Sequence, residues 1–152
     1  MKKKLISITA ICAVMLSSVI SPVSFSGKTI TQTAYATGYD REQLQDYAYQ
    51  VAVAVNRERS EKGLKLLKYS DELSESAIVR ANEIQTNFSH TRPNGTSCFT
   101  AVTDRGISYR YISENIAYGQ KSPEDVMNTW MNSSGHRANI LSENFDYIGI
   151  RS

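Results

Sequence analysis

The stretch from Trp130 to Leu141, which reads WMNSSGHRANIL, has the residue types of a binding or catalytic site. It holds the only Trp of the chain and one of only two His, and His136 directly follows Gly135. An imidazole changes charge near neutral pH and is a common metal ligand, and a glycine lets the backbone come close to a ligand. A lone His is more often structural, so any chemistry here depends on partners from elsewhere in the chain.

Two such partners stand out. His90 is the second His, and Glu114 lies just before an apolar Ile-Ala pair, an unusual place for a surface carboxylate. Two imidazoles and a carboxylate form a known ligand set for Zn²⁺, with a fourth position left for water. There is no His-Glu-x-x-His, Cys cluster, phosphate loop or Gly-x-Ser-x-Gly. The sequence therefore indicates a candidate His–Glu–His site and assigns no catalytic residue.

Three predicted helices position these residues. Apolar residues at helical spacing predict helices over about 40–62, 71–87 and 122–132, and Ser70 and Ser122 are N-cap residues of the last two. Asn56, near the end of the first helix, is expected to hold the following loop through its side-chain amide. His90 and His136 each fall just outside a helix end. A long loop after the second helix runs to about Ile107, and residues 145–150 have strand-forming character.

The first 36 residues have the form of a secretory signal. Three Lys precede an apolar run, and Ala34-Tyr35-Ala36 fits a small-x-small cleavage site, so we expect cleavage after Ala36, a lead-in over 37–43 and no transmembrane segment afterwards. Four of the 17 Lys and Arg lie in this segment, which leaves 13 basic against 15 acidic residues, a net charge of −2. That charge gives no argument for a nucleic-acid partner. Cys98 becomes the only Cys, so the mature chain has no intrachain disulfide; a Cys–His pair stays open, although an incidental Cys is favoured.

Four motifs occur in order: residues 56–64 (NRERSEKGL), 88–90 (FSH), 113–117 (SENIA) and the stretch 130–141. Together they resemble the CAP superfamily of SCP-domain, cysteine-rich secretory and pathogenesis-related-1 proteins, in its bacterial, disulfide-free branch. The resemblance implies an α+β fold over residues 44–152, a three-layer α-β-α sandwich with a central antiparallel sheet and a cleft. It implies that His90, His136 and Glu114 occupy the family's cleft positions.

The sequence departs from the family pattern in two places. Ser133 stands where the family has a second Glu, and a hydroxyl is a poorer ligand than a carboxylate and no general base. Family domains also continue into a last central strand, whereas residues 149–151 near the end of this sequence still read as strand. We therefore expect a truncated domain whose sheet lacks its final strand and exposes an unpaired edge.

Three functions remain open. The favoured one is a secreted, extracellular binding protein whose cleft is formed by His90, Glu114, His136 and Ser133. Zn²⁺ or another divalent metal would be held by His90 and His136, with Glu114 as a third ligand, and the partner would be a lipid, peptide or cell-envelope component. The alternatives are a metal-dependent peptidase or esterase and a polar cleft with a purely structural role. An enzyme is the less favoured reading, because no nucleophile–base pair is visible.

Overall fold

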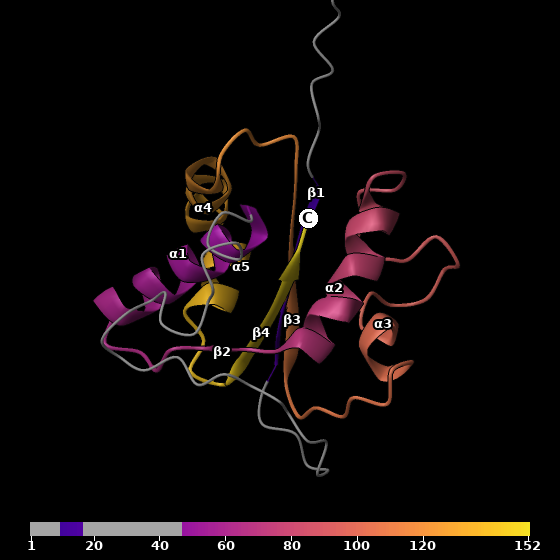
Figure 1. Ribbon diagram of the computed structural model, residues 1–152, viewed down its shortest axis with the longest axis horizontal. Helices are drawn as coiled ribbons and strands as arrows, with labels where there is room; N and C mark the ends of the chain where they lie inside the picture. The colour runs from indigo at the N-terminus through magenta and orange to yellow at the C-terminus, as the bar shows by residue number, and fades with distance from the viewer. Residues whose placement is uncertain (1–9, 17–46) are drawn as a thin grey trace, which may run out of the picture.

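The computed structural model describes residues 10–16 and 47–152 (Figure 1). The predicted cleavage site after Ala36 and the lead-in over 37–43 lie outside these residues. The helices are α1 (Tyr47–Glu61), α2 (Asp71–Ile84), α3 (Thr100–Thr103), α4 (Pro123–Asn132) and α5 (Ser134–Ile140). The strands are β1 (Ala10–Leu16), β2 (Lys68–Tyr69), β3 (Ile112–Tyr118) and β4 (Tyr147–Arg151).

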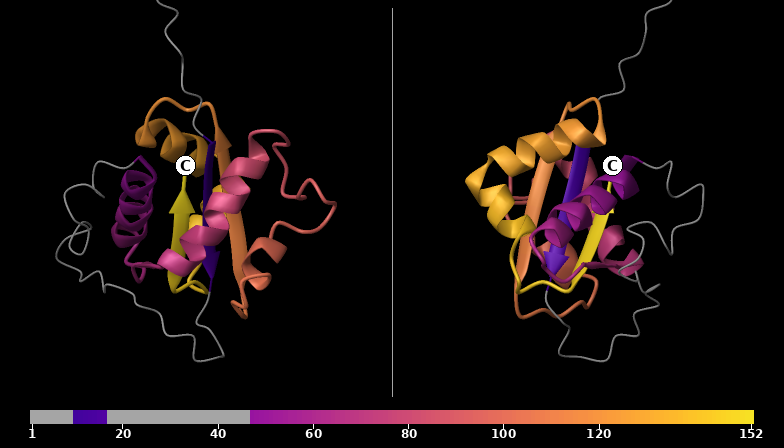
Figure 2. Two further views of the ribbon diagram at one scale, coloured as in Figure 1. Left: turned by 45° about the vertical axis from the view of Figure 1, so that its right-hand side comes forward. Right: turned by 90° about the vertical axis from the view of Figure 1, so that its left-hand side faces the viewer.

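The molecule has three layers with the sheet in the middle. Helices α1, α4 and α5 cover one face, and α2 and α3 cover the other (Figures 1 and 2). Each face has its own apolar cluster, and neighbouring residues of β1 enter different clusters because strand side chains alternate between faces. Ala13 and Met15 join the cluster with Trp130, whereas Cys12 and Val14 pack with α2. The α-β-α sandwich is therefore confirmed.

The sheet has the strand order β2-β4-β1-β3. β1 is antiparallel to both β3 and β4, but β2 and β4 run parallel, so the sheet is mixed and not purely antiparallel as expected. β3 lies at one edge of the described sheet. Because no described strand lies beyond β3, side chains from the helices on both faces of the sheet can come together beside this edge.

The central strand β1 comes from the segment that the sequence identifies as a secretory signal. Residues 12–15 are buried, and β1 pairs with β3 along its whole length of seven residues. The last strand β4 is paired on both sides among the described residues, with β1 on one side and β2 on the other. A seven-residue apolar run meets the requirements of a buried strand as well as those of a signal core.

Local signals placed most helix boundaries correctly. The hydroxyls of Ser70 and Ser122 accept hydrogen bonds from the amides of Leu73 and Asp125, as expected of N-caps. The Asn56 amide bonds both the N–H and the C=O of Leu67, and so holds the loop after α1 as predicted. Helix α2 ends at Ile84 and not near residue 87, which leaves Phe88 exposed instead of buried on its apolar stripe.

Candidate functional site

A cleft of about 370 Å³ opens beside the edge strand β3, between β3 and the loop that follows α2. His90 and Glu114, two of the residues expected from the sequence, both line this cleft. The other residues of its lining are Ser97, Cys98, Phe99, Ile112, Ser113 and Asn139. The long loop over 92–107 is thus one wall of the cleft, and it contains the short helix α3.

Glu114 is the buried acceptor at the centre of the cleft. Its side chain is only 1% exposed, and it points to the same face of the sheet as the neighbouring Val14 of β1. Arg80, which is fully buried in α2, donates from Nε to Oε2 at 2.8 Å and from Nη2 to Oε1 at 3.3 Å. The Cys12 thiol approaches Oε2 at 3.4 Å. A buried carboxylate needs this degree of pairing to offset its loss of hydration.

The electrostatic environment keeps Glu114 ionised. Burial alone would raise the pKa of Glu114, but hydrogen bonds from His90 and Arg80 outweigh burial and lower the pKa below its ordinary value. Burial would also lower the pKa of Arg80, yet its bonds to Glu114 and Glu83 raise it overall. A carboxylate with a lowered pKa binds cations and donors well but is a weak proton acceptor.

His90 contacts this carboxylate directly. Its Nδ1 lies 2.7 Å from Oε1 of Glu114, while the His90 side chain is 55% exposed. Because an ionised carboxylate only accepts hydrogen bonds, Nδ1 is the protonated nitrogen when His90 is neutral. Nε2 then carries the free lone pair. A His that donates one ring N–H to a carboxylate and offers its other nitrogen is the usual arrangement at metal sites.

A second layer of charges fixes the segment that carries His90. Arg80 Nη2 donates to the Ser89 carbonyl at 2.6 Å, and Nη1 donates to Glu83 Oε2 at 2.5 Å. Arg92 donates to the same Glu83 carboxylate at 2.9 Å and to Asp104 at 3.1 Å. The loop is therefore tied to α2 by ion pairs and does not depend on apolar packing alone.

His136 approaches from the opposite layer. It lies within α5 and not just outside a helix end as expected, because residues 134–140 form a helix of their own. Burial, followed by the proximity of His90, lowers the pKa of His136. Its Nδ1 is buried and has no hydrogen-bond partner among the described residues. His136 is thus close enough to His90 to feel its charge and has a buried ring nitrogen without a partner, but it is not among the residues that line the cleft.

Ser133 lies at the junction of α4 and α5, where it is the N-cap residue of α5 without a side-chain capping bond. It is not part of the cleft lining described above. The amide of Asn115 donates to the carbonyl of His136 at 3.1 Å, and Asn139 donates to Asn115 Oδ1 at 2.8 Å. These two Asn, and not Ser133, join α5 to β3.

Sequence reasoning did not identify Arg80 as part of this site, and it favoured an incidental Cys98 over a Cys–His pair. Arg80 falls on the apolar stripe of α2 with Leu73, Ala77 and Ile84. A charged residue on such a stripe is a sign of a buried partner, and this signal was present in the sequence. Cys98 gave no comparable signal, because only the folded loop brings it to Glu114.

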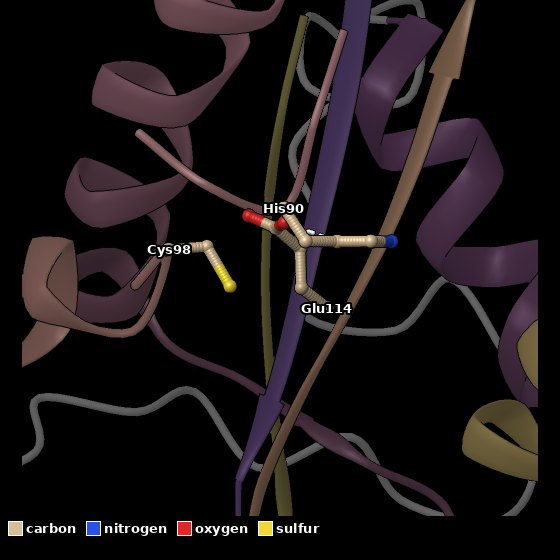
Figure 3. A group of neighbouring side chains, drawn as sticks. All are labelled: His90, Cys98 and Glu114. Carbon is tan, nitrogen blue, oxygen red and sulfur yellow. Dashed lines mark hydrogen bonds and ion pairs between the residues drawn. The ribbon is translucent and has the colours of Figure 1, made fainter. Parts of the chain in front are cut away.

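The donor atoms fit a metal ion. One ligand atom from each of His90, Cys98 and Glu114 lies within 4.8 Å of the other two (Figure 3). A metal ion about 2.0–2.3 Å from each ligand is compatible with ligand atoms that lie this close together. The unused Nδ1 of His136 is a further polar atom without a partner. The donor set contains nitrogen, oxygen and sulfur, which together suit Zn²⁺ better than Mg²⁺ or Ca²⁺.

Comparison with known proteins gives a consistent result. The model of the cysteine-rich secretory protein family, CAP, matches residues 53–152. The uncharacterized protein YkwD of Bacillus subtilis is 43% identical over 106 residues, which cover 68% of this chain and 41% of YkwD. The uncharacterized membrane protein YlbC of the same species is 25% identical over 66% of this chain and 30% of YlbC. The chain thus spans less than half the length of these curated relatives.

Solved structures agree with this. A Bacillus anthracis extracellular protein containing an SCP domain superposes with a TM-score of 0.65 at 28% identity, covering 68% of this chain and 35% of that one. A cysteine-rich secretory protein from Staphylococcus aureus superposes with a TM-score of 0.58 at 24% identity, over 74% of this chain and 36% of that one, and shows the fold alone. Within residues 10–16 and 47–152, no helix combines the length and apolar character needed to cross a membrane.

Proposed function

Because the chain belongs to the cysteine-rich secretory protein (CAP) family, as its four motifs indicated, we propose that it is a secreted binding protein whose cleft holds a divalent metal ion. His90 is the primary ligand, and Glu114 and His136 complete the protein's share of the site. The bound ion is the contact point for an extracellular ligand. The extracellular SCP-domain protein of Bacillus anthracis supports export.

The observation that carries this proposal is the contact between exposed His90 and buried Glu114. Nδ1 and Oε1 are 2.7 Å apart and the His90 side chain is 55% exposed, so the imidazole and the carboxylate that would share the ion already lie side by side. When bound, the ion would supply a Lewis-acidic contact for an oxygen or nitrogen of the ligand.

Binding is favoured over hydrolysis by the state of Glu114. A general base must exchange a proton near the working pH, whereas Arg80 and His90 hold the pKa of Glu114 below its ordinary value. Ser133, at the position of a second carboxylate, lies outside the cleft lining. The described cleft therefore offers ligands for an ion but no second carboxylate for acid–base chemistry.

Isothermal titration of the full chain with Zn²⁺ tests the proposal. One zinc per chain is expected, with affinity lost in His90→Ala and at least about tenfold weaker binding in His136→Ala. Ser133→Ala is the matched control and should bind as the unaltered chain does. Absence of zinc uptake by the unaltered chain, or equal uptake by His90→Ala, would show that the cleft is not a metal site.

A further inference from the structure

Cys98 is a buried member of the three candidate ligands that lie close together at the cleft. Its side chain comes from the loop after α2, the residue is 5% exposed, and it lines the cleft. Figure 3 shows its sulfur directed toward Glu114.

We propose that Cys98 is a thiolate ligand of the metal ion in this cleft, together with His90 and Glu114. This inference rests on the proposed function, because it concerns the ion that the cleft holds. Cys98 adds a sulfur ligand to the nitrogen and oxygen ligands of the proposed site. Such a set selects a borderline or soft ion, with Zn²⁺ favoured over Mg²⁺, Ca²⁺ and Mn²⁺.

Coordination by Cys98 requires that the thiol lose its proton. The divalent ion takes the sulfur lone pair, and the thiol proton leaves to solvent, so each metal ion that binds releases a proton from Cys98. Burial and the neighbouring Glu114 carboxylate raise the pKa of free Cys98 to about 11. Without metal the thiol is therefore protonated and a poor nucleophile, which argues against a catalytic Cys–His pair.

The charges around the cleft suit a divalent cation. Two guanidinium groups and three carboxylates are linked by ion pairs, so this network carries one net negative charge. Its members are Arg80, Arg92, Glu83, Glu114 and Asp104. A Cys98 thiolate would add a second negative charge, which a divalent ion neutralises. A buried thiolate without the ion would carry a large desolvation cost.

Arg80 prepares Glu114 for this role. It engages Oε2 at 2.8 Å through Nε, and its contact with Oε1 is longer, at 3.3 Å. Oε1 is the oxygen that also faces His90. A ligating carboxylate is commonly held by hydrogen bonds in this way, which fix its orientation before the metal binds. Arg80 is therefore a positioning residue and not a ligand.

Cys12 provides a matched control within the same chain. Its thiol also contacts Glu114, at 3.4 Å from Oε2, but it belongs to β1 and is not one of the three groups that converge. Both thiols are buried, so replacing either one by Ser changes the core by a similar amount. A difference between the two variants then reports on metal coordination and not on the loss of a buried sulfur.

Cobalt spectroscopy on the reduced full chain tests the proposal. Co²⁺ replaces Zn²⁺ at such sites and gives a near-ultraviolet thiolate-to-metal charge-transfer band only when sulfur is a ligand. We expect this band in the unaltered chain and in Cys12→Ser, and its loss in Cys98→Ser, with at least about tenfold weaker metal binding. Circular dichroism of the three proteins establishes that each is folded.

The outcomes separate the two proposals. Cobalt bound with visible ligand-field absorption but without a thiolate band would overturn the role of Cys98 and leave the metal cleft intact. A band that persists in Cys98→Ser and disappears in Cys12→Ser would identify Cys12 of β1 as the sulfur ligand. That result would also overturn the role of Cys98. If the unaltered chain takes up no cobalt and no zinc, both this inference and the proposed function fail.

Discussion

Replacing Arg80 by Met tests whether the buried charge network holds the site together. Arg80 is fully buried and donates to Glu114, Glu83 and the Ser89 carbonyl. Met fills much of the same volume, so the main effect is the loss of the positive charge and its hydrogen bonds. The Glu83 side chain is 18% exposed and keeps Arg92. The Glu114 side chain is 1% exposed and keeps no other guanidinium partner among the described residues.

The magnitude follows from the stranded Glu114 carboxylate. Removing one partner of a buried ion pair costs about 3–5 kcal/mol, because the remaining charge has lost both water and its counter-ion. Urea unfolding at neutral pH should therefore show a lower midpoint with an unchanged slope. Adding Glu114→Gln to Arg80→Met should recover part of the loss, with a coupling energy of about 1–3 kcal/mol.

Arg105→Met is the matched control for this experiment. Arg105 pairs with Glu75 at 3.8 Å, and both side chains are largely exposed. Exposed pairs contribute little, so this variant should lose no more than about 1 kcal/mol. The reasoning would be refuted if Arg80→Met also lost less than about 1 kcal/mol, or if the double variant were as unstable as the sum of the single ones.

Three further predictions concern the packing and the pH response of the fold. Gly149→Ala should lower stability by about 3 kcal/mol in thermal unfolding, because a Cβ there would lie 2.4 Å from the backbone carbonyl carbon of Leu73; an unchanged melting temperature would contradict this packing. Val14→Asp in the full chain should lower the free energy of unfolding by about 3 kcal/mol or more, because Val14 is buried in β1 and is paired with Glu114 of β3. An unchanged free energy of unfolding would place β1 outside the core. The folded-state pKa of Glu114 is lowered, so its contribution to stability is present above the ordinary carboxyl pKa of about 4.3 and is lost as the pH falls through the folded value. Urea unfolding across acidic pH should show this decline, and Glu114→Gln should flatten it; equal slopes in both proteins would contradict the assignment.

The sequence predicted those parts of the fold that depend on local signals. Ser70 and Ser122 sit before apolar, helix-forming runs, and their capping role needs no information from distant residues. The contact between His90 and Glu114 was accessible only through the motif resemblance, because the two residues are 24 positions apart and belong to different elements. Spacing alone does not say which loop returns to which strand.

Other features could not be predicted because they depend on the whole fold. The apolar residues 10–16 are compatible with both a signal core and a buried strand, and only the sheet shows them between β3 and β4. This strand lies outside residues 53–152, which match the family. Likewise, β2 is only two residues long, too short for a periodic pattern, so its parallel pairing with β4 left no trace in the sequence.

The most direct test of the metal cleft is an anomalous-scattering experiment on crystals of the protein soaked in Zn²⁺. Difference maps calculated from data on either side of the zinc absorption edge locate the ion without reference to the chain. The account predicts one strong peak in the cleft, within about 2.0–2.3 Å of a nitrogen of His90 and an oxygen of Glu114. A cleft without a peak in fully soaked crystals, or zinc bound only at the protein surface away from His90, would contradict it.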